Sequence, residues 1–143
     1  GAGLGYGPGA AIGAALALKG SGKLAVAIQS DGDMLMTSSA IWTAAKHRIP
    51  LLMVMHNNQS YFNSEEHGME VAKFRKRDVG NAGIGTHVDD PAIDFAMMAK
   101  SFGVNSEGPV RNPADLRPAI ERGVKYVKEQ QKPYLVDVIA EPR

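Results

Sequence analysis

Short apolar runs recur along the chain, separated by polar or glycine-rich segments. Each run has the length of a buried strand, and the runs are rich in valine, isoleucine and leucine. They predict strands over residues 23–29, 51–55 and 134–140, with a weaker strand near Val104. Because helical segments separate these runs, the sequence predicts the α/β class, with a doubly wound, mostly parallel sheet flanked by helices.

The helical segments show their own apolar periodicity and end signals. The longest predicted helix begins at Asn112, a capping residue followed by proline. Apolar side chains recur at helical spacing from Leu116 to Val127 and predict a buried stripe. Three further helices are predicted over residues 10–19, 34–47 (with Asp33 as its N-cap) and 91–102.

Two segments do not follow this alternation. Gly1–Gly7 is a glycine-rich loop with no strand before it, where an α/β domain would normally have one. We therefore expect the chain to be a fragment of a longer protein. Residues 59–90 carry glycines and charges around a possible short helix at 65–74, which predicts a long loop over the site. The basic cluster at 73–77 is expected to be a solvated surface.

The composition limits the number of domains and the class of partner. With 143 residues, 44% of them apolar, the chain is expected to form a single domain over residues 1–143. The net charge of +1 gives no general attraction to nucleic acid or to a membrane. The chain has no cysteine, which excludes zinc–thiolate sites and fits the cytoplasmic location that we expect. The longest apolar stretch, residues 10–18, is far shorter than the roughly 18–20 residues that span a bilayer.

Two polar clusters close two of the predicted strands. Ser30–Asp33 follows the first strand and His56–Ser60 follows the second, so that Asp31 and Asn58 stand 27 positions apart. If both strands are parallel, one helix and one strand return the chain to the same edge of the sheet. Asp31, Asn58 and the Ser60 carbonyl would then offer three hard oxygen ligands to Mg²⁺ or Ca²⁺ beside a phosphate group.

Structural explanations compete with this hypothesis. An Asp-Gly turn such as Asp31-Gly32 is on its own more often a turn than a ligand site. Two adjacent asparagines after a buried strand shift this balance, because buried amides need partners. Neither Gly1–Gly7 nor Gly20–Lys23 completes a dinucleotide or phosphate-loop motif. A non-catalytic nucleotide- or phosphate-binding α/β module remains the alternative.

The spacing of these clusters resembles a known cofactor motif. Ser30-Asp31-Gly32, then 24 residues, then Asn57-Asn58 is similar to the Gly-Asp-Gly and Asn-Asn motif of thiamine-diphosphate-dependent enzymes. The benzoylformate decarboxylase and acetolactate synthase branch is the most similar. Residues 4–13, 39–50, 94–103 and 135–138 also resemble that branch. Two departures are Ser30 in place of the first glycine and Pro8-Gly9 in place of a Leu-Pro pair.

The resemblance implies a role for each matching residue. Asp31, Asn58 and Ser60 would hold Mg²⁺, the last through its carbonyl. The other cofactor contacts would be Ala2 and Gly3 at the aminopyrimidine, Leu4 beneath the bent cofactor, Ser30, Gly32, Asp33 and Met34 at the diphosphate, and Tyr61 and Phe62 at the thiazolium. His56 and His67 are further candidates for proton transfer or substrate contact, with simple structural roles as the alternative.

The resemblance also implies a function. The chain would be the thiamine-diphosphate- and Mg²⁺-binding domain of a 2-oxo acid decarboxylase or carboligase. The activating glutamate would come from a pyrimidine-binding domain, in the same protein or a second subunit, so the chain alone would be inactive. A homodimer or homotetramer is expected, and FAD in the complete protein is undecided.

Overall fold

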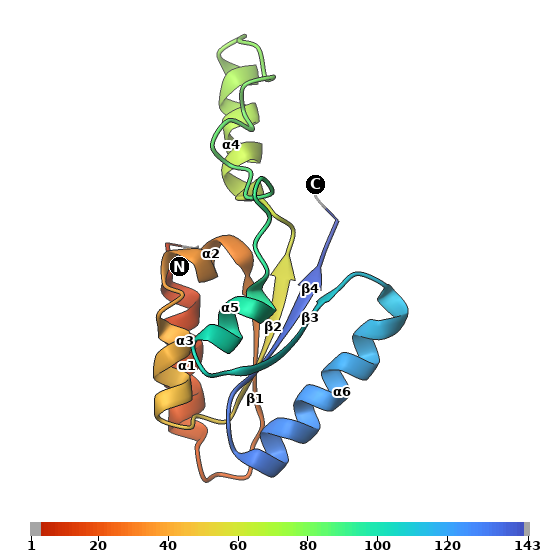
Figure 1. The fold of residues 1–143 in the computed structure, drawn as a ribbon. Helices are drawn as coiled ribbons and strands as arrows, with labels where there is room; N and C mark the ends of the chain where they lie inside the picture. Colours follow the sequence, from red (N-terminus) through yellow and green to blue (C-terminus); the bar gives the residue numbers. More distant parts are fainter. Residues whose placement is uncertain (1–3, 142–143) are drawn as a thin grey trace.

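The computed structural model describes residues 4–141, which form a four-stranded parallel sheet flanked by helices (Figure 1). The strands lie in the order β1-β2-β4-β3, and every neighbouring pair is parallel. The strands are β1 (Ala25–Ser30), β2 (Leu51–Asn57), β3 (Asn105–Val110) and β4 (Tyr134–Ile139). The helices are α1 (Tyr6–Leu18), α2 (Asp31–Met36), α3 (Ala40–Lys46), α4 (Phe62–Phe74), α5 (Phe95–Ser101) and α6 (Pro113–Gln130). The predicted α/β class and flanked parallel sheet are confirmed.

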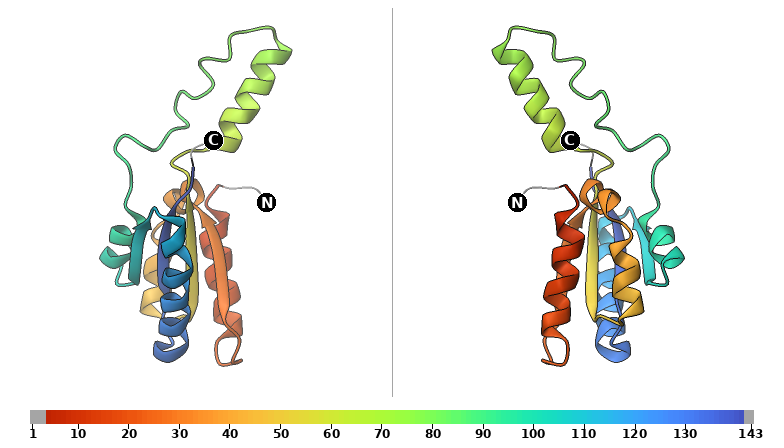
Figure 2. Two further views of the ribbon diagram at one scale, coloured as in Figure 1. Left: turned by 90° about the vertical axis from the view of Figure 1, so that its right-hand side faces the viewer. Right: turned by 90° about the vertical axis from the view of Figure 1, so that its left-hand side faces the viewer.

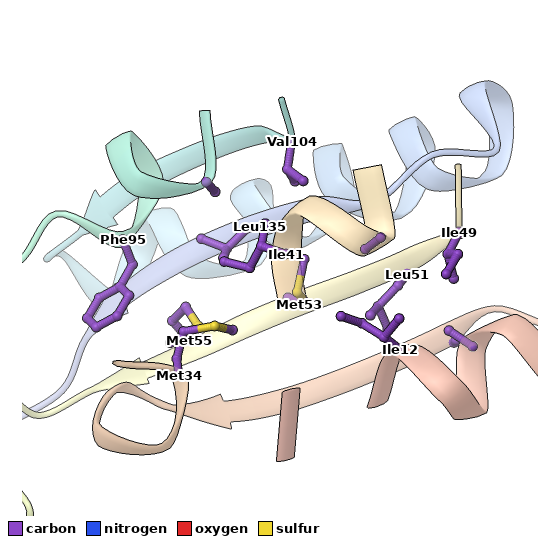
Figure 3. Close-up of a cluster of buried hydrophobic side chains, with 14 residues drawn as sticks. Ile12, Met34, Ile41, Ile49, Leu51, Met53, Met55, Phe95, Val104 and Leu135 are labelled. Carbon is purple, nitrogen blue, oxygen red and sulfur yellow. The ribbon is translucent and has the colours of Figure 1, made fainter. Parts of the chain in front are cut away.

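The hydrophobic core has two parts, one on each face of the sheet. On one face, side chains of α1, α2, α3 and α5 pack on β2 and β4 around Ile12, Met34, Ile41, Phe95 and Leu135 (Figure 3). On the other face α6 covers β2, β3 and β4, where Val127 and Ala119 are buried. The predicted stripe of α6 thus packs on the sheet, and Asn112 caps this helix by accepting the N–H of Ala114 at 3.0 Å.

Three of the predicted helices have different boundaries in the structure, and the possible short helix at 65–74 begins earlier, at Phe62. The helix predicted over 34–47 is two helices, because the hydroxyl residues 37–39 interrupt it and have low helix propensity. The helix predicted from residue 10 begins at Tyr6 and includes Pro8, which the first turn tolerates because its N–H groups have no helical acceptor. The helix predicted from Pro91 begins at Phe95, since the Asp94 carboxylate accepts the N–H of Met97 at 2.7 Å and caps it there.

The segment 59–90, which we call the arm, projects beyond the carboxyl ends of the strands (Figures 1 and 2). It consists of α4 and a return segment that is joined to the start of the arm by hydrogen bonds. The N–H of Tyr61 donates to Thr86 O at 2.8 Å, and the N–H of Val88 donates to Gln59 O at 2.9 Å. None of the thirteen residues of α4, all of which are described, is buried. The basic residues at 73–77 are exposed, as expected.

The edge strand β1 leaves one face uncovered. Val26 and Ile28 point away from the α1 side and are 54% and 81% exposed, because α6 lies over the other three strands. Such an apolar edge is typical of a surface that another element covers. Among residues 4–141, no helix combines the length and apolar character needed to cross a membrane.

Candidate functional site

The candidate site lies at the carboxyl ends of β1 and β2. In the register of this parallel pair Ser30 stands beside His56, so the residues that follow both strands meet at one edge. Ligands of open α/β sheets bind at this edge. Asp31 begins α2 directly after β1, and Asn58 and Ser60 lie in the turn between β2 and α4. The predicted convergence of the two polar clusters is therefore present in the structure.

The Asp31 carboxylate joins the two clusters. It is 1% exposed, and its oxygens accept the N–H of Gly32 at 2.7 Å and of Gln59 at 2.6 Å. Burial raises the pKa of Asp31 above its ordinary value, while these N–H groups and the nearby His56 lower it in part. A cation beside the carboxylate would favour its ionised form, and each oxygen keeps a second lone pair for such a contact.

The side chain of Asn58 faces three oxygen atoms. One terminal atom of its amide lies 3.0 Å from the Ser60 carbonyl and 3.2 Å from both carboxylate oxygens of Asp31. Without a cation, the amide NH₂ group satisfies these three acceptors. With the amide oxygen in that place, the donors would surround a cation, since Mg²⁺–oxygen distances near 2.1 Å place neighbouring octahedral ligands about 3.0 Å apart. The donor set therefore fits a hard divalent ion.

Two further observations bear on a ligand at this site. Ser60 Oγ is buried and has no hydrogen-bond partner among the described residues. Within residues 4–141 there is no cluster of three or more His, Cys, Asp or Glu side chains that could hold a metal. A cation in this part of the chain would depend on amide and carbonyl oxygens, which is the donor set that Asn58 and Ser60 supply beside Asp31.

A pocket of about 380 Å³ opens beside these oxygens. Nine of the twelve cofactor-contact residues expected from the sequence line it: Leu4, Ser30, Asp31, Gly32, Asp33, Asn58, Ser60, Tyr61 and Phe62. The side chain of Met34 is fully buried in the core instead, so only its backbone could contact a ligand. Ala2 and Gly3 lie outside the described residues. Only the base of the arm reaches this pocket, so the structure does not place the whole of residues 59–90 over the site.

Gly32 allows the aromatic ring of Tyr61 to lie against the turn after β1. A Cβ atom at Gly32 would be 2.6 Å from Tyr61 Cδ1 and would overlap Cε1 as well. Any side chain at this position would therefore displace the ring. The close approach brings the arm's base and the β1 turn together as two walls of the pocket.

Asp33 lies within α2 and is not the cap of a helix that starts at Met34, as the sequence had suggested. The residue in the N-cap position of α2 is Ser30. The Asp33 carboxylate instead accepts N–H groups from Gly5 and Gly7, at 2.6 and 2.8 Å. Asp33 is also one of the residues that line the pocket.

Sequence reasoning missed one buried polar link behind the site. Asp137, fully buried in β4, accepts hydrogen bonds from the Asn57 side chain and from the Phe95 N–H, both at 3.1 Å. A carboxylate inside the apolar run 134–140 was the available signal, because such a group needs partners when it is buried. Of the two candidate histidines, His56 lines the pocket, whereas His67 is exposed on α4 and does not.

Comparisons with known proteins show the family of this chain. The family described as "Thiamine pyrophosphate enzyme, C-terminal TPP binding domain" matches residues 2–138. Benzoylformate decarboxylase of Pseudomonas aeruginosa is 28% identical over 95% of this chain and 23% of its own length. A protein of Methanocaldococcus jannaschii named "Probable acetolactate synthase large subunit" is 25% identical over 97% of this chain and 21% of its own length. The chain thus spans about a quarter of the length of these relatives.

Solved structures share the fold. A thiamine diphosphate-dependent 4-hydroxybenzoylformate decarboxylase of Rhodococcus jostii RHA1 superposes with a TM-score of 0.69 at 24% identity, covering 96% of this chain and 23% of that one. Benzoylformate decarboxylase of Polynucleobacter necessarius superposes with a TM-score of 0.68 at 17% identity, covering 96% and 24%. With a family match over nearly its whole length, the chain belongs to the thiamine pyrophosphate enzymes and corresponds to their C-terminal TPP-binding domain.

Proposed function

We propose that this domain binds Mg²⁺ and the diphosphate of thiamine diphosphate at the carboxyl ends of β1 and β2, as part of a 2-oxo acid decarboxylase or carboligase. The observation that carries the proposal is the convergence of the Asn58 amide on the Ser60 carbonyl and the Asp31 carboxylate within about 3.2 Å. The names of the relatives, benzoylformate decarboxylase and acetolactate synthase, support a 2-oxo acid as substrate.

The residues of the chain would divide the work of holding the cofactor. Asp31, Asn58 and the Ser60 carbonyl would hold Mg²⁺, and Ser30, Gly32, Asp33 and Met34 would border the diphosphate, the last through its backbone. Leu4 would support the cofactor from below, with Ala2 and Gly3 at the aminopyrimidine, and Tyr61 and Phe62 would flank the thiazolium side. When bound, thiamine diphosphate supplies a nucleophilic carbon and an electron sink for the loss of CO₂.

Because the cofactor would supply the reactive carbon, the residues of this chain would bind and orient it. Two aromatic residues at the base of α4, Tyr61 and Phe62, are half-buried and would limit access of water from the arm side. Leu4, 84% exposed in the pocket wall, offers an apolar surface that a bound ring would cover. His56 lines the same pocket.

We also infer that the active form needs a pyrimidine-binding domain, from the same protein or from a second subunit in a homodimer or homotetramer. Two surfaces support this partner. The apolar face of β1 is open at Val26 and Ile28. In addition, none of the thirteen residues of α4 is buried. A helix of this length is marginally stable in isolation and is stabilised by packing against another surface.

Calorimetry on the complete protein tests the proposal. Thiamine diphosphate should bind with Mg²⁺ present and fail to bind after EDTA treatment. Asp31→Ala should weaken binding by more than the ~10–100-fold that loss of an outer-shell partner of a metal costs. Asp115→Ala, at an exposed acidic residue of α6, is the matched control and should bind normally. Binding that ignores Mg²⁺, or an Asp31→Ala variant that binds like the control, would refute the metal role.

The alternative of a non-catalytic phosphate- or nucleotide-binding module makes a different prediction. Such a module would bind ADP or inorganic phosphate and be indifferent to thiamine diphosphate. ADP should therefore be titrated under the same conditions, and a preference for it over thiamine diphosphate would favour the alternative. With binding established, pyruvate and benzoylformate serve as substrate probes for the reaction, and the products separate decarboxylation from ligation.

A further inference from the structure

The carboxylate of Asp33 connects two segments that are far apart in the sequence. Its Oδ1 accepts the N–H of Gly5 at 2.6 Å, and its Oδ2 accepts the N–H of Gly7 at 2.8 Å. A third donor, Gln29 Nε2, reaches Oδ2 at 2.9 Å, and the Gln29 side chain is itself buried. The Asp33 carboxylate thus accepts three N–H hydrogen bonds, two of them from the start of α1.

The sequence explains why α1 needs this partner. Its N-cap is Gly5, which has no side chain, and the first turn of this fully described helix holds no acidic residue. The first N–H groups of a helix lack helical acceptors and carry the positive end of its dipole. A carboxylate that reaches them from another helix satisfies both needs. Asp33 therefore acts as the N-cap that α1 lacks locally.

The contact is so close that it requires glycine at position 7. A Cβ atom there would overlap Asp33 Oδ2 and would lie 2.8 Å from both terminal atoms of Gln29. A second bond strengthens the same link, because the Thr37 hydroxyl donates to the Gly5 carbonyl at 2.8 Å. Residues 5–7 are therefore joined to α2 and its C-cap by hydrogen bonds from both the N–H and the carbonyl groups of this segment.

This link fixes a wall of the candidate pocket. Leu4 directly precedes the held segment, has a left-handed backbone with φ of 61°, and lines the same pocket as Asp31. We propose that Asp33 is a positioning residue whose carboxylate fixes Leu4–Gly7 against the Asp31 turn and so sets the pocket for thiamine diphosphate. The cofactor part of this inference rests on the proposed function. The link between Asp33 and α1 does not depend on it.

The test compares variants of the complete protein. Asp33→Asn keeps the shape but replaces one accepting oxygen with an NH₂ group that faces donors, and Asp33→Ala removes the link. Asp115→Asn is the control, since Asp115 is an exposed acidic residue in the first turn of α6. Hydrogen exchange of peptides that span α1 and the preceding loop measures the link itself. Steady-state kinetics against the concentration of thiamine diphosphate, with Mg²⁺ and pyruvate or benzoylformate, measure its effect on the pocket.

We expect faster exchange at Gly5 and Gly7 in both Asp33 variants, with Asp33→Ala the larger change. The KM for thiamine diphosphate should rise about tenfold or more, the scale of a lost charge-assisted hydrogen bond, while kcat at saturation stays within about twofold. A residue with a merely structural role would not separate KM from kcat in this way. Unchanged exchange at Gly5 and Gly7 would overturn the link, and faster exchange with an unchanged KM would overturn its positioning role.

A double variant makes the test independent of folding losses in Asp33→Ala. Gly7→Ala alone should lower the melting temperature, because the new methyl group overlaps the carboxylate. In the Asp33→Ala background the carboxylate is gone, and the Gln29 amide, which has lost its hydrogen bond to Asp33, is free to turn away from position 7. Gly7→Ala should therefore lower the melting temperature much less in this background, because alanine is favoured over glycine in a helix. Equal effects of Gly7→Ala in both backgrounds would contradict the link. A wild-type protein that binds no thiamine diphosphate would refute the proposed function, whereas the exchange and double-variant data would still decide whether Asp33 holds α1.

Discussion

Asp137 of β4 and Asn57 of β2 form a buried hydrogen bond of 3.1 Å directly behind the candidate site. Asn57 is the last residue of β2 and immediately precedes Asn58, so this bond fixes the end of the strand that carries a proposed metal ligand. The second oxygen of Asp137 accepts the N–H of Phe95 at 3.1 Å and so connects α5 to the same point. The carboxylate thus joins two neighbouring strands and a helix.

The first prediction concerns the pH dependence of stability. Burial raises the pKa of Asp137 above its ordinary value of 3.8, with Asp94 adding to this and Asn57, Phe95 and Arg111 opposing it. The folded protein therefore binds this proton more readily than the unfolded chain. As pH rises from 3.8 to the raised pKa, the free energy of unfolding of the wild-type protein should therefore decrease. Asp137→Asn has no carboxyl group at this position and should not show this decrease. Urea unfolding of both proteins across this interval measures the difference.

An asparagine at position 137 can keep both contacts if the Asn57 amide rotates, which makes it a suitable comparison. Wild-type stability should thus fall relative to the variant as pH rises, and the difference should level off above the raised pKa. Parallel stability curves for the two proteins would show that Asp137 titrates alike in the folded and unfolded states.

The second prediction concerns the contact between Gly32 and Tyr61. Gly32→Ala should push the Tyr61 ring out of its place, destabilise the protein by ~1–3 kcal/mol and weaken thiamine diphosphate binding. Gly13→Ala is the matched control, because a Cβ atom at Gly13 meets nothing within 4 Å. The control should gain roughly 0.5–1 kcal/mol from its helical position and bind normally. If the two variants had the same unfolding free energy, the close packing of Tyr61 on Gly32 would be disproved.

The third prediction concerns the arm. Trypsin should cut the arm first at the exposed basic residues 73–77. None of the residues of α4 is buried, so this helix should open locally more easily than the helices packed on the sheet. Because Ser60, Tyr61 and Phe62 line the pocket, thiamine diphosphate with Mg²⁺ should slow cleavage by ordering the arm's base. The rates are compared by gel electrophoresis or mass spectrometry, with cleavage after the exposed Lys23, outside the arm, as an internal reference. Equal rates at 73–77 with and without cofactor would argue against such ordering.

Local signals were sufficient to predict the alternation of strands and helices and, with the strands taken as parallel, the meeting of the two clusters. The apolar runs predict the strands, and the Asn112 cap predicts the start of α6. The parallel pairing of the strands then places Asp31 and Asn58 at one edge of the sheet. The break after Met36 was missed because Trp42 and its neighbours continue the apolar pattern across three hydroxyl residues. The role of Asp33 was missed because its partners, Gly5 and Gly7, are 28 and 26 residues away. Long-range pairing of this kind leaves no mark in local periodicity.

The fourth prediction concerns the packing of α6 on the sheet at Gly123. A Cβ atom there would lie 2.7 Å from Leu52 Cδ1 and 3.0 Å from Tyr134 Cδ1, two residues that are register partners in β2 and β4. Leu52 is buried, and Tyr134 is confined by the Tyr126 ring at 5.1 Å, so neither can yield freely. Gly123→Ala should therefore destabilise the protein by ~1–3 kcal/mol, although alanine favours helices by about 1 kcal/mol over glycine. Thermal unfolding beside Gly13→Ala measures this, and a stabilised Gly123→Ala would show that α6 can move away from the sheet without loss.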